Sequence, residues 1–543
     1  MSTAPPIASS PLTLLGGNRT FLAIWTAFLA SSLAGSMQDT ATVWQMTSLR
    51  SDSPILVSLM QTASSLPFFL LALPAGALAD VVDRRRLLLV GQIWRTLIAL
   101  ILTACAFLNL VDPYLLLTVT FAMSLGATFT MPAWQAAFPE VVSPHDVPPA
   151  MYLCGVVTNI ARGLGPALAG LLLGLFAPRS VYTANAAMML SGLGLFLLWQ
   201  RGPRPQALPS ERLVGAMKAA VRYVAHAPAV DAILSRNVVF VIFTSAPMSL
   251  FPVVARSQLH LDGLDFGISM TLLGLGAVLV SVFLLPRICS RFSIDQVVGV
   301  SAAVAALASA AISLLRSPLS FNAALFVLGA ASSTALASLN LGAQLSVPDW
   351  VRGRTSSVYL FLVQGAFALG ALTWGYAATR WGVSTILLVA AAGFVATAAL
   401  GFVQPLPQLA RMNLSASHHW PAFHLVTTLR PDDGPVLVQI DYEISPEAAT
   451  EFRQVMQSVR TIRLRDGGMR WVLLDDLNQP GHYRESFLVE SWSEHLRQME
   501  RSTLDDAEIE ERARNLQVDG RAPQVHHFLV TAPPGSGVLK PLD

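Results

Sequence analysis

Charged residues are scarce in the first three quarters of the chain. Residues 1–405 hold 21 Lys and Arg and 13 Asp and Glu, about 8% of that stretch, whereas residues 406–543 hold 14 and 20, about 25%. Soluble domains are typically about 25% charged. The scarcity excludes a soluble enzyme, a nucleic-acid-binding protein and a disordered chain for residues 1–405. We therefore expect a membrane domain followed by a soluble domain.

Cysteine is also rare, and no pattern predicts a bound metal or nucleotide. The three cysteines, Cys105, Cys154 and Cys289, lie in apolar stretches without a ligand-spaced neighbour, so they predict neither a disulfide framework nor a zinc site. The phosphate-binding pattern Gly-x-x-x-x-Gly-Lys-[Ser/Thr] is absent from the sequence, which argues against ATP as the direct energy source. We expect no cofactor.

Long apolar runs dominate residues 1–405. Because lipid offers the backbone no hydrogen-bond partners, apolar runs of about 20 residues predict helices that cross a bilayer. Twelve runs are present: 20–45, 54–79, 87–110, 114–137, 150–176, 180–200, 230–255, 266–288, 296–315, 320–345, 355–378 and 383–403. The sequence therefore predicts an all-α membrane domain with an N-terminal half (1–200), a central polar loop (201–229) and a C-terminal half (230–405).

The basic residues predict the orientation of these helices. If the N-terminus is cytoplasmic, the inner segments collect fourteen Lys and Arg and the outer loops five, as the positive-inside rule favours. We therefore expect both termini in the cytoplasm. In the central loop, Ser210 can cap a helix that places Leu213 and Met217 on one face, which would lie at the membrane surface. A simple connector whose basic residues only set the topology explains this loop equally well.

A charged motif follows the second run: Gly76-Ala-Leu-Ala-Asp80-Val-Val-Asp83-Arg84-Arg85-Arg86. It resembles the loop signature G-x-x-x-D-x-x-G-R-[KR] of the major facilitator superfamily. Gly76 would permit close helix approach, Asp80 can pair with basic groups, and Arg84 and Arg85 anchor the loop. Asp83 stands where the family has glycine, so the turn there cannot depend on a glycine-only conformation. Together with Glu140, this motif is interpreted as a cytoplasmic gate.

The fifth run contains a second motif, Asn159-Ile-Ala-Arg162-Gly163-Leu-Gly165-Pro166-Ala-Leu-Ala-Gly170. It resembles the exporter-associated motif of the same superfamily, in which Gly-Pro kinks the helix and small residues let a partner helix pack closely. The resemblance implies efflux. Small residues are common in membrane helices, so Gly-Pro alone would carry little weight.

The segments Met131–Glu140 and Glu490–Arg497 extend the resemblance to the transmembrane secretion effector branch, which is related to bacterial enterobactin and macrolide exporters. It covers nearly the whole chain. It implies a proton-coupled secondary exporter of a drug, siderophore or secondary metabolite in the bacterial inner membrane, working by alternating access. The implied partners are a small-molecule substrate, lipid and protons, without nucleic acid. The alternatives are a membrane-bound ligand sensor and, more weakly, a membrane-tethered monooxygenase.

Three ionisable residues lie within the runs of the N-terminal half: Asp39, Arg95 and Arg162. A charge in hydrocarbon costs about 2.5–3.5 kcal/mol on insertion scales, so each favours a functional role. A proton-coupled exporter needs an acid whose protonation changes between its two states. We hypothesise that Asp39, with Arg95 or Arg162, forms a charge relay beside a cavity. Alternatively, Asp39 lies in water at the outer end and the arginines satisfy buried carbonyls.

Polar amides interrupt several apolar runs. Their hydrogen-bonding groups either face a central cavity or join neighbouring helices. The six candidates for the cavity are Gln135, Asn159, Asn185, Asn340, Gln344 and Gln364.

Residues 406–543 have the composition and patterning of a soluble α+β domain. Strands are predicted at 436–442, 469–474, 483–489 and 524–530, and helices follow caps at Ser445 and Ser491 and cover 505–516. This order predicts a ferredoxin-like fold and resembles the dimeric α/β-barrel modules related to antibiotic-biosynthesis monooxygenases. His482, His495, His526 and His527 have no metal-ligand spacing. We expect this domain to mediate self-association or to sense substrate rather than to act as an enzyme.

Overall fold

The computed structural model describes residues 11–50, 53–198, 222–403, 406, 413–417, 420, 430, 432–518 and 523–531. It separates into two compact units. The bundle comprises 1–210, 234–341 and 357–406, and the tail unit comprises 211–233, 342–356 and 407–543. The helix predicted to begin at Ser210 falls largely outside the described residues.

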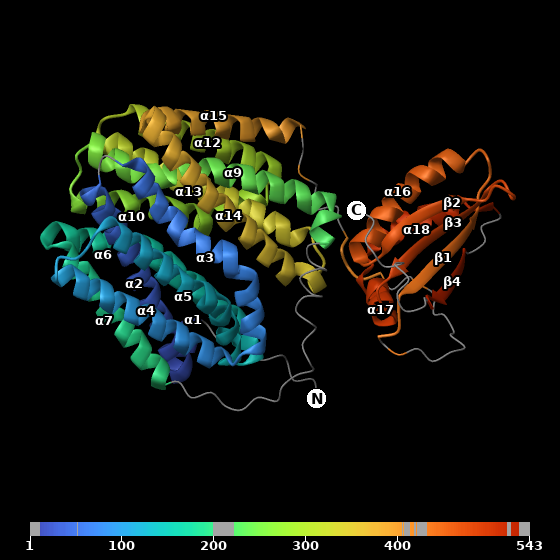
Figure 1. The fold of residues 1–543 in the computed structure, drawn as a ribbon, viewed down its shortest axis with the longest axis horizontal. Coiled ribbons are helices and arrows are strands. Elements are labelled where there is room, and N and C mark those ends of the chain that lie inside the picture. The colour runs from blue at the N-terminus through green and yellow to red at the C-terminus, as the bar shows by residue number, and fades with distance from the viewer. Residues whose placement is uncertain are drawn as a thin grey trace. The chain divides into compact units, whose positions relative to one another are not determined.

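Twelve helical stretches of the described chain are long and apolar enough to cross a membrane, which confirms the predicted all-α membrane fold (Figure 1). The N-terminal half has α2 (Arg19–Leu49), α3 (Pro54–Val81), α4 (Arg84–Phe107), α5 (Pro113–Glu140), α6 (Val147–Leu175) and α7 (Pro178–Leu198). The C-terminal half has α9 (Pro228–Val253) continued by η2 (Val254–Gln258), α10 (Gly263–Leu279) continued by η3 (Val280–Leu284) and α11 (Leu285–Cys289), α12 (Ile294–Leu314), α13 (Pro318–Leu345), α14 (Asp349–Trp381) and α15 (Val383–Val403). The short elements α1 (Pro11–Gly17) and η1 (Pro144–Asp146) precede α2 and α6.

Polar side chains cap several of these helices. The Asp112 and Asp262 carboxylates accept hydrogen bonds from the backbone N–H groups of Leu115 and Asp265 at 2.7 and 2.8 Å. Asp83 caps α4 in the same way, accepting from the Arg86 N–H at 2.9 Å, and its φ is −54°. The residue that replaces the motif's usual glycine is therefore a helix N-cap in an ordinary backbone conformation.

Each half has its own packing. In the N-terminal half α2 packs against α6 and α7, α4 packs against α5 and α7, and α3 packs against α5. In the C-terminal half α12 and α15 lie side by side (Figure 1), and Phe240, Phe321 and Phe394 are fully buried in the core. Aromatic side chains thus contribute to the core of the C-terminal half.

The two halves meet through close helix contacts. A Cβ atom at Gly170 on α6 would lie 2.5 Å from the Gly267 Cα on α10. Nearby, the rings of Trp44 and Phe266 stack at 5.2 Å. These contacts lie at the end of the bundle that carries the α2–α3 connection. The halves also meet between α3 and α14, where the rings of Phe69 and Phe361 stack at 4.6 Å.

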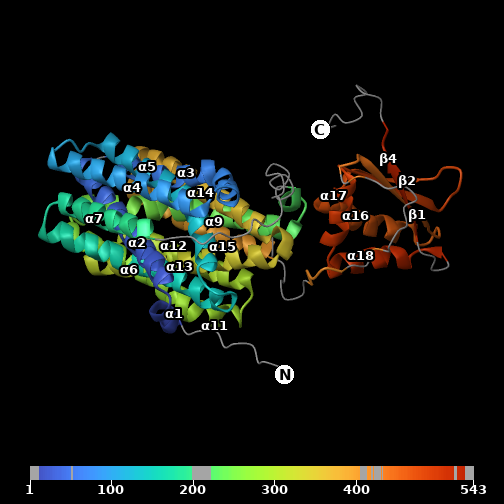
Figure 2. The same ribbon diagram turned by 90° about the horizontal axis from the view of Figure 1, so that it is seen from below.

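The tail unit contains a four-stranded antiparallel sheet in the order β2-β3-β1-β4, where the strands are β1 (Val436–Glu443), β2 (Met469–Asp475), β3 (His482–Val489) and β4 (Gln524–Leu529). Its helices are α16 (Ala449–Asp466), α17 (Trp492–Arg501) and α18 (Leu504–Asn515). Figure 2 shows the helices on one side of the sheet. This is the predicted ferredoxin-like topology. The predicted cap at Ser445 is wrong, because α16 begins after Ala448, which makes no side-chain cap.

Candidate functional site

A cavity of about 640 Å³ lies between the two halves of the bundle. The N-terminal half contributes residues of α2, α3, α5 and α6, and the C-terminal half contributes residues of α9, α10, α13 and α14. The volume is within the range of small-molecule binding sites.

The N-terminal wall of the cavity is charged and polar. Asp39 on α2 and Arg162 on α6 both line it and are exposed to it, and they are the only charged residues among its described lining. The hydroxyl groups of Ser36, Thr40 and Thr120 lie on the same wall. The structure therefore brings two of the three predicted relay residues to one cavity.

Arg95, the third predicted relay residue, lies behind this wall. Its side chain passes α5 and reaches α2, because a Cβ atom at Gly126 would lie 2.7 Å from Arg95 Cγ and one at Gly35 would lie 3.1 Å from Arg95 Nη2. The charges of Arg95 and Asp39 are close enough to interact electrostatically. Gly35 and Gly126 make room for the arginine, a role that the sequence pattern alone did not indicate.

The C-terminal wall is mostly apolar. Met248, Phe251, Met270 and Leu273 contribute to it, and no charged residue from this half is among the described lining. Methionine is flexible and polarizable, so such a wall adapts to ligands of different shapes. The cavity thus has one charged wall and one adaptable apolar wall.

Two hydroxyl groups of the lining have no hydrogen-bond partner in the described structure. Thr120 on α5 is 7% exposed and Ser332 on α13 is 3% exposed, and both Oγ atoms are unpaired. An unpaired buried hydroxyl is unfavourable by about 1–3 kcal/mol, and a bound ligand or water can remove this penalty. These two groups lie on opposite halves.

The six predicted cavity amides have different positions. Asn340 lines the cavity, whereas Asn185 is fully buried and donates a hydrogen bond to Gln38, so it joins α7 to α2 rather than facing the cavity. Gln135 is exposed on α5, and the remaining three are half-buried outside the described lining: Asn159, Gln344 and Gln364. A buried amide pair of this kind joins neighbouring helices without a ligand.

The glycines of the α6 motif mediate helix packing. A Cβ atom at Gly165 would lie 2.5 Å from Ser36 Oγ, and Gly170 contacts Gly267, whereas Gly163 leaves an ordinary 3.8 Å contact to Leu275. Pro166 lines the cavity. The motif therefore places α6 against α2 of its own half and against α10 of the other half.

The predicted gate motif is partly described. Arg84, the first residue of α4, forms an ion pair with Glu140, the last residue of α5, and Arg85 lies in the same first turn. A Cβ atom at Gly76 would meet no described atom within 4 Å, so the close packing expected there stays a prediction. The side chain of Asp80 lies outside the described side chains.

Residues 9–534 match the family described as transmembrane secretion effector. The chain belongs to this family. It is an integral membrane protein of the major facilitator type, and its described residues include twelve candidate spans. Among the described residues of this secretion effector, no group of three His, Cys, Asp or Glu side chains is placed to hold a metal ion.

Named relatives of this secretion effector are transporters. It is 24% identical over 174 residues to macrolide efflux protein A of Streptococcus pyogenes, an alignment that covers 32% of this chain and 41% of the relative. It is 22% identical over 319 residues to the staphyloferrin A transporter of Staphylococcus aureus (strain NCTC 8325 / PS 47), covering 58% and 79%. The chain thus spans less than half of the macrolide exporter's length.

Solved transporters share the fold of this secretion effector. The crystal structure of nucleoside transporter NupG superposes with a TM-score of 0.59 at 13% identity, covering 71% of this chain and 99% of that chain. At this identity the likeness shows the fold alone.

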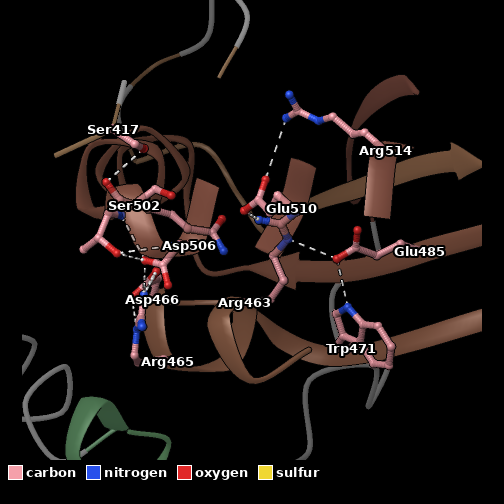
Figure 3. Close-up of polar contacts among 12 residues, drawn as sticks. Ser417, Arg463, Arg465, Asp466, Trp471, Glu485, Ser502, Asp506, Glu510 and Arg514 are labelled. Atoms are coloured by element: carbon pink, nitrogen blue, oxygen red, sulfur yellow. Dashed lines mark hydrogen bonds and ion pairs between the residues drawn. The ribbon is translucent and has the colours of Figure 1, made fainter. Parts of the chain in front are cut away.

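The tail unit of the secretion effector has a buried network of charges. Figure 3 shows Arg463 between two acids: its Nε donates to Glu485 at 3.0 Å and its Nη1 donates to Glu510 at 2.6 Å. Glu485 is fully buried and also accepts from the Tyr442 hydroxyl and the Trp471 indole. Burial lowers the pKa of Arg463, but the two carboxylates outweigh burial and raise it.

Proposed function

We propose that this protein is a proton-coupled exporter of small amphipathic organic compounds. The two-walled cavity supports this proposal, because a charged wall faces an apolar one. The names of the relatives, a macrolide efflux protein and a staphyloferrin A transporter, support export of drug-like or siderophore-like compounds. The protein has no enzymatic role in this proposal.

The single observation that carries the proton step is the exposure of Asp39 to the cavity. It is the one acid of the described lining, so protons and substrates meet the same carboxylate. A substrate group that carries positive charge or donates a hydrogen bond competes with a proton for Asp39. This competition exchanges an inward proton for an outward substrate.

The arrangement of the two halves around the cavity supports transport by alternating access. With both termini in the cytoplasm, the end that carries the Gly170–Gly267 and Trp44–Phe266 contacts faces outward. Arg84 and Glu140 then lie at the cytoplasmic end, where their ion pair ties α4 to α5. We place the protein in the bacterial plasma membrane.

Transport by purified protein in liposomes tests the proposal. With a pH gradient, the wild-type protein should accumulate at least one of three probes: erythromycin, staphyloferrin A or rhodamine 6G. Asp39→Asn should lower this accumulation at least tenfold, because the amide cannot exchange a proton. Exchange of labelled for unlabelled probe without a gradient should persist, because the asparagine retains the size of the aspartate.

The matched control is Asp231→Asn, which removes an exposed acid in the first turn of α9, outside the described cavity lining. Its accumulation should stay within twofold of wild type. Gradient-driven accumulation that survives in Asp39→Asn would contradict the proton step. Accumulation of every probe no greater than in empty liposomes would contradict export, and probe binding without flux would favour the ligand sensor.

We further propose that the tail unit self-associates through the open face of its sheet. Val472 and Leu474 on β2 and Phe528 on β4 are between 46 and 49% exposed, and they lie on strands whose alternate residues pack toward the helices. β2 and β4 are the two edge strands of the sheet, so exposed apolar side chains lie at both edges of this face, where a second copy of the domain can pack. Truncation after Pro405 that leaves the oligomeric state unchanged would contradict this assignment.

A further inference from the structure

The tail unit encloses two segments that introduce helices of the C-terminal half. One segment, 222–227, precedes α9, and the other is the first turn of α14 at Trp350. Tyr223 of the first segment is only 2% exposed, although it lies far in sequence from the sheet and helices around it. Its burial shows that the tail unit is completed by these segments.

Arginines of the tail unit stack on both aromatic rings. The Arg465 guanidinium carbon lies 5.3 Å from the centre of the Tyr223 ring, and that of Arg501 lies 4.5 Å from the Trp350 ring. The two rings pack edge-to-face at 5.7 Å. Cation–aromatic contacts are strongest when they are shielded from water, as the burial of Tyr223 makes them here.

A shared carboxylate joins the same two parts. Glu494 on α17 accepts from Arg501 Nη1 at 2.6 Å and from Arg222 Nη2 at 3.1 Å. Burial raises the pKa of Glu494, but the two arginines outweigh burial and lower it. Gly467 ends α16 at a φ of +133°, and a Cβ atom there would lie 3.3 Å from Arg222 Nη2. The turn at residue 467, which lies against the Arg222 side chain, therefore requires glycine.

We call these residues the clasp: Arg222, Tyr223 and Trp350 on the helix-introducing segments, and Arg465, Glu494 and Arg501 on the sheet-bearing part. We infer that the clasp holds the sheet-bearing part, residues 413–531, onto the starts of α9 and α14 without help from the covalent connection, and so braces these two helices. Both helices supply cavity residues, Met248 and Phe251 from α9 and Tyr359 from α14. The consequence for transport rests on the proposed function, whereas the attachment does not.

Cleavage of the connecting chain tests the attachment. A tobacco etch virus protease site is inserted between Pro407 and Gln408, and the purified full-length protein is cut and passed over a gel-filtration column at about 1 μM. The cleaved sheet-bearing part should elute with the membrane part, because the clasp contacts do not involve the cut segment. If the sheet-bearing part of the cleaved wild-type protein elutes separately from the membrane part, the inference is overturned.

Clasp variants should release the cleaved part. Tyr223→Ala and Trp350→Ala each remove a stacked ring and should raise the dissociation constant at least tenfold, and Arg222→Ala should raise it less. The matched control is Arg484→Ala, which removes an ion pair with Asp441 that lies at the surface of the sheet, and it should co-elute as the wild type does. Clasp variants that retain the cleaved part as tightly as this control would refute the assignment of the clasp.

Transport by the uncut variants tests the brace. Release of α9 and α14 in Tyr223→Ala should change the initial rate of probe transport at least threefold, whereas Arg484→Ala should leave it unchanged. An unchanged rate in a variant that releases its cleaved part would contradict the brace while leaving the attachment in place. A wild-type protein that transports no probe would instead contradict the proposed function, and the elution test would stand.

Discussion

The cavity of the bundle and the interior of the tail unit both hold charged side chains away from bulk water, but the two regions pair them differently. In the tail unit Arg463 is 3% exposed, and its Nε and Nη1 groups each donate to a carboxylate. In the cavity Asp39 and Arg162 form no ion pair with a described residue, although both face open space. Elsewhere in the bundle, Arg236 and Asp295 do pair.

Charged residues away from bulk water have two uses in this protein. Removing a charge from water is unfavourable, and a complete set of partners offsets this cost within the fold. Where a charged group lacks such partners, only water, a proton or a ligand can offset the cost of its desolvation. Paired charges therefore indicate structure, and unpaired charges in a cavity indicate function.

The largest effect should follow the loss of Arg463. Arg463→Met leaves Glu485 and Glu510 buried without their shared cation, which should lower the free energy of unfolding of the tail unit by about 3–5 kcal/mol. Hydrogen exchange of the β1 and β3 amides in the full-length protein measures this loss.

Two further variants test whether paired charges stabilise the fold and unpaired cavity charges do not. Arg463→Met/Glu485→Gln/Glu510→Gln removes the stranded charges and should recover most of the lost protection. Arg162→Met in the cavity breaks no ion pair of the described structure, so the protection of the bundle should change by less than about 1 kcal/mol. A loss of several kcal/mol there would break the distinction between the two regions.

Acid should destabilise the tail unit through His495. Burial, followed by the neighbouring His527, lowers the pKa of His495 from 6.5 to about 4, and the two Nε2 atoms are 3.0 Å apart. Between pH 6.5 and pH 4 the unfolded chain binds a proton that the folded tail unit does not, so stability falls as the pH falls through this window. The loss approaches about 3 kcal/mol near pH 4, at 1.36 kcal/mol per pKa unit.

Hydrogen exchange of the same strands at pH 7 and pH 4.5, corrected for the intrinsic exchange rates, measures this dependence. His495→Gln removes the titrating ring and should flatten it. A wild-type profile that stays level over this range would show that His495 titrates normally in the folded protein.

The smallest effect should come from a surface ion pair whose hydrogen bonds are about as short as those of Arg463. Arg484 donates to both oxygens of Asp441, at 2.6 and 3.1 Å, but its side chain is 50% exposed. Arg484→Ala should therefore lower the stability of the tail unit by no more than about 1 kcal/mol, because water competes for both partners. A loss as large as that of Arg463→Met would mean that geometry, rather than burial, sets the contribution of an ion pair.

The sequence was sufficient for the fold because its signals are local. Hydrophobic runs predict the spans, and the largest boundary difference is six residues, at the start of α14. The strand and helix order of the tail unit predicts its sheet topology. The sequence also indicated Asp39, Arg95 and Arg162 as candidates for a cavity, since a charge within an apolar run is costly in lipid, and two of the three line it.

The rotation of each helix about its axis was not predictable in the same way. Asn185 and Asn340 interrupt similar apolar runs, yet one joins α7 to α2 and the other faces the cavity. A helix that is apolar on all sides carries no stripe that distinguishes its buried face. The clasp was missed because Tyr223 meets Trp350, and Arg222 meets Glu494, only in the tertiary fold.

The contact between Gly170 and Gly267 has a mechanical consequence. Because neither residue has a side chain, two backbones touch directly, and α6 and α10 have no interlocked rotamers to disengage at that point. Rotation of one helix against the other at this point therefore changes few van der Waals contacts. The absence of side chains also sets the distance between the two helices, since a single methyl group on either glycine would force them apart.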